Sequence, residues 1–154
     1  MADPWVTVTA NDVLGAMTKR EREDFATVST DVEVPDRVTP ILADLVAEIR
    51  GYITTWSQNT VSADSTKIPQ SFRARALDLA RARVLATIPG YDQGEDRRKA
   101  TEAAESFFKR VADGKIRPEP AEDARANTTP NEVPAGVEWS APGSRTGRNR
   151  MNGL

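Results

Sequence analysis

Residues 38–56 read VTPILADLVAEIRGYITTW, and this stretch decides the fold. Its apolar side chains recur at steps of three and four residues, which places them along one face of an α-helix. Pro40 falls in the first turn, where a missing backbone N–H costs no hydrogen bond, and Asp36 is the expected N-cap. The apolar stripe comprises Val38, Ile41, Leu42, Leu45, Val46, Ile49, Tyr52, Ile53 and Trp56. Such a stripe needs neighbouring elements to cover it.

Two further helices can supply that cover. Pro69 is expected to open the first, and Pro89-Gly90 to end it. The second starts after Gly94, with acids in its first turn and bases in its last turn, and ends at Gly114. Their apolar faces comprise Phe72, Ala76, Leu79, Ala80 and Val84 in the first, and Ala100, Ala103, Ala104, Phe107, Phe108 and Val111 in the second.

Two short helices are expected ahead of the long one. Thr9 with Asp12, and Thr18 with Glu21, have the three-residue spacing of helix N-caps. The polar stretch 57–67 is predicted to be a surface loop, and no strand pairs are predicted. The sequence therefore predicts an all-α fold, a small helical bundle of about four to five helices.

The last part of the chain has a different composition. From Arg117 to Leu154 prolines alternate with glycines, and few large apolar residues remain. Such a segment cannot bury enough apolar surface to offset its ordering entropy. We therefore predict a helical domain over residues 1–116 and a long extended Pro/Gly-rich C-terminal arm over residues 117–154, which partners would order.

The amino-acid composition excludes several classes of function. The chain has no cysteine and no histidine, so thiolate and imidazole chemistry are excluded. The carboxylates are spread over polar helix faces. We therefore expect no enzyme, and no catalytic, cofactor-binding or metal-binding residues. A net charge of −2 argues against a generic nucleic-acid binder. The sequence shows no signal peptide and no apolar run of about 20 residues. We therefore expect synthesis in the cytoplasm and no membrane partner.

The arginines of the helix that is predicted between Pro69 and Pro89 leave three interpretations open. Arg73, Arg75, Arg81 and Arg83 can pair with acids of the same bundle, contact a neighbouring subunit, or read nucleic acid. Trp56 can cap the core or anchor an interface. The candidates for contacts between subunits are Trp56, Arg73 and Arg81.

The arm supplies the other candidate interface residues. Trp139 sits in a segment with no core of its own, so a pocket on another chain is its expected environment. The tip is basic and is suited to acidic surfaces or phosphates, or serves only solubility. The predicted interface with a portal or a neighbouring subunit comprises Ile116, Arg117, Val133, Val137, Trp139, Arg145, Arg148, Arg150, Met151 and Leu154.

The order of these motifs resembles a known family. A Trp-x-Thr lead at Trp5 precedes the short helices, and the long helix ends in Tyr52-Ile-x-x-Trp. Ile68-Pro-x-x-Phe-x-x-x-Ala-x-x-Leu-Ala-x-x-x-Val follows, and then Val111-Ala-Asp-Gly-Lys-Ile. Over about Pro4 to Pro118 the chain resembles the head-to-tail adaptor, or connector, proteins of tailed bacteriophages.

The resemblance implies a structural virion protein without a cofactor. Members of the connector family form a ring beneath the portal, commonly a dodecamer, at the neck of the virion. The resemblance also implies synthesis in the host cytoplasm. The C-terminal segment of each subunit docks on the portal protein, and the other side of the ring receives stopper or tail proteins. Genomic DNA passes through the channel without sequence readout.

Two alternatives compete with the adaptor. The first is a small DNA-binding packaging factor, similar to a terminase small subunit. It would use the predicted helix that carries Arg73 and Arg81 to recognise DNA, and the basic tip as an arm. A helical interaction module with a linker would instead remain monomeric. Salt-dependent DNA binding separates the packaging factor from the adaptor, because phosphate contacts make affinity fall steeply with salt.

Overall fold

The computed structural model describes residues 4–29 and 36–125 of the chain. Within these residues there are five α-helices, and the predicted mostly helical bundle is confirmed. They are α1 (Ala10–Ala16), α2 (Lys19–Ser29), α3 (Val38–Thr55), α4 (Arg73–Leu85) and α5 (Glu95–Ala112).

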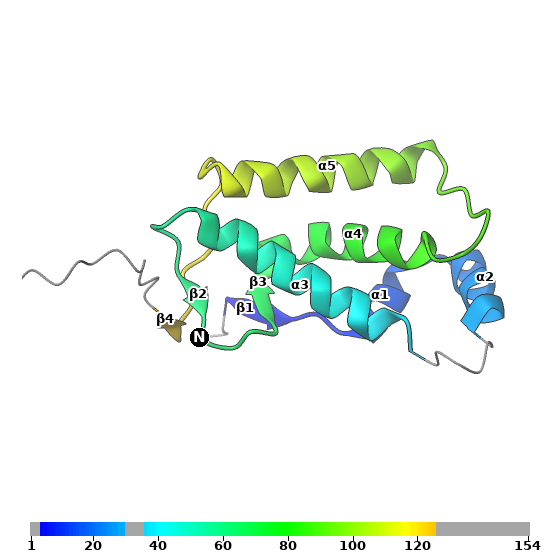
Figure 1. The fold of residues 1–154 in the computed structure, drawn as a ribbon, viewed down its shortest axis with the longest axis horizontal. Helices are drawn as coiled ribbons and strands as arrows, with labels where there is room; N and C mark the ends of the chain where they lie inside the picture. Colours follow the sequence, from blue (N-terminus) through cyan, green and yellow to red (C-terminus); the bar gives the residue numbers. More distant parts are fainter. Residues whose placement is uncertain (1–3, 30–35, 126–154) are drawn as a thin grey trace, which may run out of the picture.

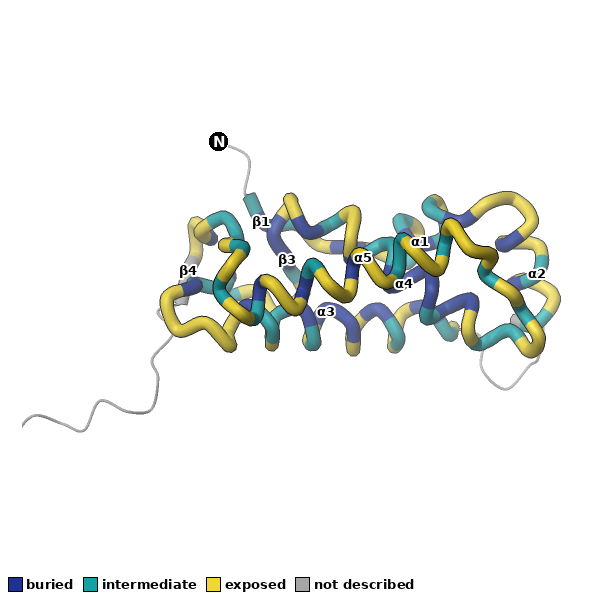
Figure 2. The backbone as a smooth tube through the Cα atoms, turned by 90° about the horizontal axis from the view of Figure 1, so that it is seen from above, coloured by how far each residue is buried: buried dark blue, intermediate teal, exposed yellow. Residues whose placement is uncertain are grey.

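The three long helices lie side by side, and α1 and α2 lie at one end of them (Figure 1). Each of α3, α4 and α5 contacts the other two, and α1 packs on α3 and α4. Exposed residues alternate with buried ones along α5, so only one of its faces is covered (Figure 2). Helix α4 is covered on more sides, which explains its many alanines: small side chains allow close packing with three neighbours.

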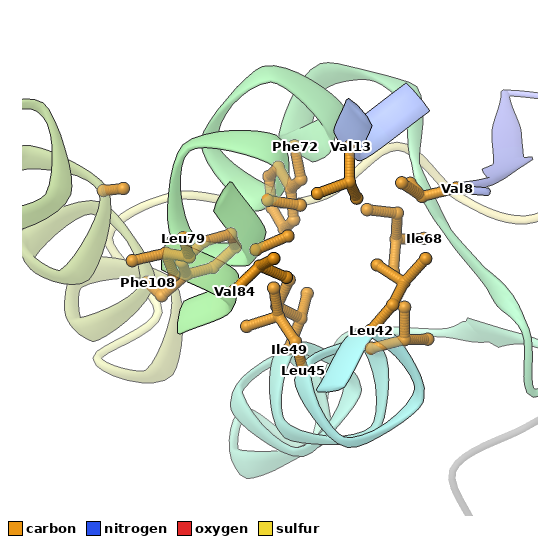
Figure 3. Close-up of a cluster of buried hydrophobic side chains, with 14 of the residues drawn as sticks. Val8, Val13, Leu42, Leu45, Ile49, Ile68, Phe72, Leu79, Val84 and Phe108 are labelled. Carbon is orange, nitrogen blue, oxygen red and sulfur yellow. The ribbon is translucent and has the colours of Figure 1, made fainter. Parts of the chain in front are cut away.

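The core joins the apolar faces of these helices to side chains of the N-terminal segment. Ile49 from α3, Val84 from α4 and Phe108 from α5 are at most 1% exposed and point toward one another (Figure 3). Phe72 packs edge-on against Phe107 and Phe108, with ring centroids 5.1 and 5.9 Å apart. This edge-to-face arrangement is favourable beyond its buried area.

The capping contacts predicted at the starts of α1, α2 and α3 are present, but the N-cap residue of α3 is Arg37 and not the predicted Asp36. Thr9 and Asp12 form a reciprocal capping box at α1. At α2, the Thr18 N–H donates to Glu21 Oε2 over 2.7 Å. Asp36 Oδ1 accepts from the backbone N–H groups of Val38 and Thr39, both at 3.1 Å. These contacts are local in sequence, which is why spacing alone predicts them.

The prediction that the chain has no strand pairs is wrong. Strand β1 (Trp5–Thr7) pairs antiparallel with β3 (Lys67–Pro69), and β2 (Val61–Ser62) pairs antiparallel with β4 (Ala124–Arg125). Strands of two or three residues are too short to show alternation. Pro69 is the last residue of β3 and also the N-cap of a 3₁₀ helix, η1 (Gln70–Phe72), which runs directly into α4, so the prediction that Pro69 opens this helical segment is confirmed.

The stretch 57–67 is more than the predicted surface loop. Asn59 and Ser62 are 5% and 1% exposed. Asn59 Nδ2 donates to the Ile53 carbonyl over 3.0 Å, which satisfies one of the unpaired carbonyl groups at the end of α3. Polar composition misled the prediction here, because these polar groups are buried by forming hydrogen bonds with the backbone.

Replacing glycine by alanine is predicted to have opposite effects on stability at two positions, Gly51 and Gly114. Gly51 lies inside α3, and a Cβ there would have no atom within 4 Å. Gly51→Ala is therefore expected to raise the free energy of unfolding by about 1 kcal/mol. Gly114 has a φ of +72°, and a Cβ there would lie 2.6 Å from Trp56 Cδ2. Gly114→Ala should destabilise the protein.

Urea unfolding of both variants, followed by far-UV circular dichroism, measures the pair. A Gly51→Ala variant less stable than the parent would contradict the open environment of that position. An unchanged Gly114→Ala variant would contradict the close contact between residue 114 and the Trp56 ring.

Candidate interaction site at the C-terminal junction

Residues 117–125, which we call the C-terminal junction, are packed on the helical body. The indole N–H of Trp5 donates to the Glu119 carbonyl over 2.9 Å. The Ser71 hydroxyl donates to Glu119 Oε2 over 2.7 Å, and Ala121 is 7% exposed. The first strand and the start of η1 therefore hold the same turn of the junction.

A second attachment lies further along the junction. Asp123 Oδ2 accepts from the Ser62 hydroxyl at 3.0 Å and from the Ala63 N–H at 3.2 Å. Directly after it, β4 pairs with β2, with Arg125 opposite Val61. The prediction of an arm that begins at residue 117 is therefore wrong for residues 117–125, because strand pairing and side-chain hydrogen bonds hold them on the body.

Arg50 connects this site to α3. Its guanidinium donates to the carbonyls of Ser62, Asp64 and Lys67 at 2.7, 3.0 and 2.8 Å. It also lies over the Trp5 ring, 5.7 Å from the ring centroid. Burial lowers the pKa of Arg50, and the nearby carboxylates of Asp64 and Asp123 counteract that effect. One cation thus orders the loop that carries β2 and contacts the tryptophan that holds the junction.

Trp56, a candidate for contacts between subunits, lies at the other side of the junction. It is the C-cap of α3, its ring packs over Gly114, and 36% of it remains exposed. Among the described residues no other large apolar side chain is classed as exposed. Trp56 is not among the side chains that pack against the core cluster, and its exposed part is a surface that a partner can reach.

The first two predicted interface residues have different environments. Ile116 is half-buried and packs against the core, so most of it serves the body. Arg117 is exposed, and its guanidinium lies 3.4 Å from Gln58 Oε1. The other predicted interface residues lie outside the described residues: Val133, Val137, Trp139, Arg145, Arg148, Arg150, Met151 and Leu154.

The arginines of α4 pair within the chain. Arg73 Nη2 lies 2.7 Å from Asp12 Oδ1 of α1, and Arg83 pairs with Glu48 of α3. Arg81 is 3% exposed and lies beside Glu21. Arg81 thus has almost no surface to offer a neighbouring subunit, and the interpretation that these arginines pair with acids of their own bundle describes all three.

Glu21, Arg81 and Tyr91 form a buried polar cluster. Arg81 Nε lies 3.4 Å from Glu21 Oε1 but has no hydrogen-bond partner among the described residues. The Tyr91 hydroxyl donates to Glu21 Oε1 over 3.1 Å. Burial raises the pKa of Glu21, but the Thr18 N–H and the charge of Arg81 outweigh it and the pKa lies below its ordinary value. Glu21 and Tyr91 line a cavity of about 620 Å³ between α2 and residues 88–92.

Acidic side chains elsewhere are arranged as a solvated surface. Glu95 pairs with Arg98 and Lys99, and Glu102 with Arg98, at exposed positions of α5. Such pairs contribute little to stability. Within residues 4–29 and 36–125 no group of three or more acidic side chains is placed to hold a metal ion. In the same part of the chain, no helix has the length and apolarity to cross a bilayer.

Sequence patterns missed the residues that build the junction. Arg50 lies in a helix next to a glycine, and Asp123 lies in a polar segment, so neither has a local signature. Their partners are 12–17 and 60–61 residues away in the chain. Trp5 was singled out in the sequence only as part of the Trp-x-Thr lead of the family resemblance.

Comparison with known proteins adds no relative. No protein-family model, curated protein or solved structure matches the chain.

Proposed function

We propose that this chain is a structural adaptor of a tailed-bacteriophage virion, which forms a ring beneath the portal and joins it to stopper or tail proteins. The observation that carries the proposal is the C-terminal junction. It holds the chain on the body up to Arg125, through Glu119, Asp123 and β4. A fixed position of Arg125 gives every copy of the arm the same starting point, which a ring needs if many arms are to reach one larger ring.

Arms on one ring would act together. An arm that folds on its partner loses ordering entropy, so each contact alone is weak. Copies held on one ring bind with a high effective concentration after the first has engaged. In this proposal the arms dock on the portal protein, and the ring encloses DNA that passes without sequence readout.

The packaging-factor alternative is less compatible with the geometry. A recognition helix has to present side chains to a groove of DNA. Helix α4, which carries the arginines, packs against α1, α3 and α5, and its arginines pair with Asp12, Glu21 and Glu48. If the full chain nonetheless bound duplex DNA with a steep salt dependence that Arg73→Ala reduced, the packaging factor would replace the adaptor.

A truncation tests the proposal. A chain that ends at Arg125 keeps Asp123 and β4, whereas a cut before Asp123 would also remove contacts of the body. We expect the truncated chain to keep its helical circular dichroism but to be lost from phage particles. Immunogold labelling with antibodies against residues 4–125 should mark the neck of particles that carry the full chain. Label elsewhere, or normal incorporation of the truncated chain, would overturn the proposal.

A further inference from the structure

An apolar groove lies on the side of α3 that faces neither α4 nor α5. It has a volume of about 400 Å³ and none of its lining residues is charged. Its floor is the edge of the core at Val8, Leu42 and Val46, which are 5–7% exposed. Val8 and Leu42 lie with Ile68 along one side of the core cluster (Figure 3). Thr39, Ala43 and Ala47 line it from α3, and Thr7, Ser65 and Thr66 complete it.

The chain contains one segment with the matching pattern. Residues 133–139 read VPAGVEW, so Val133, Ala135, Val137 and Trp139 occupy every second position. In an extended backbone these four side chains would share one face. The segment carries a single charge, Glu138, whereas the basic tip at Arg145, Arg148 and Arg150 has no counterpart in an uncharged groove.

The direction of the chain at Arg125 favours the groove of a second copy over the chain's own groove. Because Ala124 lies opposite Ser62 and Arg125 opposite Val61, the chain at Arg125 runs toward Thr60. The groove lies beyond Ser62 in the other direction, at Ser65 and Thr66. At Arg125, the last described residue, the chain therefore points away from its own groove.

The reach suffices for an adjacent copy. At about 3.3–3.6 Å per residue, Val133 can lie up to about 29 Å from Arg125, and Trp139 up to about 50 Å. A small domain has a diameter of about 30 Å. We propose that Val133–Trp139 of one copy of this chain docks in the α3 groove of a second copy. A docked tryptophan would remove about 150–250 Å² of its surface from water.

This inference rests on the proposed function only in that a ring sets copies side by side. It divides the arm into two parts: Val133–Trp139 links neighbouring copies, and the basic tip remains for the portal. Immunogold labelling of the neck tests the proposed function, and crosslinking between two copies tests this inference. Either measurement can fail while the other succeeds.

The absence of cysteine makes crosslinking selective, because an introduced thiol is the only one in the chain. We would mix full-length Ala43→Cys chains with size-tagged full-length Ala135→Cys chains and treat them with a flexible bismaleimide. Docking holds the two thiols at an effective concentration of about millimolar, against micromolar for free encounters. In the control, Ala103→Cys, at an exposed position of α5, replaces Ala43→Cys. The yield of crosslinked mixed dimer should be at least about tenfold higher with Ala43→Cys than in this control.

Two further variants test the assignment. Ala47→Arg places a charge in the groove at an exposed helical position and should abolish the mixed dimer, whereas Ala103→Arg should leave it unchanged. A mixed dimer no stronger than the control would overturn the proposal. So would a double Ala43→Cys/Ala135→Cys chain that crosslinks only within itself, since the arm would then occupy its own groove.

Discussion

Replacing Trp5 by alanine is expected to lower the free energy of unfolding by about 3–5 kcal/mol, the range for removing a buried tryptophan. Trp5 is 1% exposed. Its ring contacts the Arg50 cation, and its N–H holds the Glu119 carbonyl. The substitution therefore removes apolar contact and releases the C-terminal junction. Urea unfolding measures the loss, and hydrogen exchange at residues 117–125 should show the release.

Two controls separate these effects. Trp5→Phe keeps an aromatic ring but removes the N–H, so it should lose about 1 kcal/mol through the hydrogen bond to Glu119, plus a part for the smaller ring. Trp56→Ala removes a ring that is 36% exposed and should cost less than half as much as Trp5→Ala. A Trp5→Ala loss within about 0.5 kcal/mol, as at an ordinary surface position, would show that Trp5 does not hold the junction.

Replacing Arg81 by methionine is expected to cost about 3–5 kcal/mol, because it leaves the Glu21 carboxylate buried without its cation. The side chains of Arg81 and Glu21 are 3% and 7% exposed. After the change, the described hydrogen bonds to the Glu21 carboxylate are those from the Thr18 N–H and the Tyr91 hydroxyl. Chemical unfolding at neutral pH measures the cost.

The pH dependence gives this prediction a second readout. The pKa of folded Glu21 lies below its ordinary value of 4.5, so its ionised form stabilises the native protein above that pH. This contribution is lost as the pH falls through the folded pKa. In Arg81→Met one of the two cations that lower the pKa of Glu21 is gone, the charge of Arg97 and the hydrogen bonds from Thr18 and Tyr91 remain, and burial still raises the pKa. The cost of the substitution should therefore be largest at neutral pH and shrink on acidification.

The double variant Glu21→Gln/Arg81→Met is the matched control. Glutamine keeps an oxygen for the Thr18 N–H and carries no charge, so the double variant should be more stable than Arg81→Met alone. If the two variants were equally unstable at every pH, lost packing rather than an unpaired charge would explain the cost. The assignment of Glu21 and Arg81 as a coupled pair would then be wrong.

The sequence predicted the helices because their signals are local. The stripe of α3 recurs within 18 residues, and each capping contact spans two or three positions. It also anticipated that the arginines of α4 could pair within the bundle, without naming Asp12, Glu21 and Glu48. Composition misled the prediction in two places. It gave residues 57–67 as a plain surface loop, although Asn59 and Ser62 within it are buried, and it placed residues 117–125 off the body.

Function was reachable from the sequence only as a resemblance, and the interface residues from Val133 onward remain predictions. The groove on α3 has no signature in the sequence, because its floor uses the same residues that the helical stripe assigns to the core. Only the positions of Thr7, Ser65 and Thr66 around that stripe turn its edge into a groove.

What the sequence by itself determined is a bundle of amphipathic helices and the capping contacts of α1, α2 and α3, since hydrophobic periodicity and capping act over a few residues. Only the tertiary structure decided how residues 117–125 attach to that bundle. Trp5 with Glu119, and Ser62 with Asp123, meet across 114 and 61 positions of sequence. Contacts at that separation depend on how the helices pack, because closing such long stretches of chain costs entropy and leaves no local pattern in the sequence.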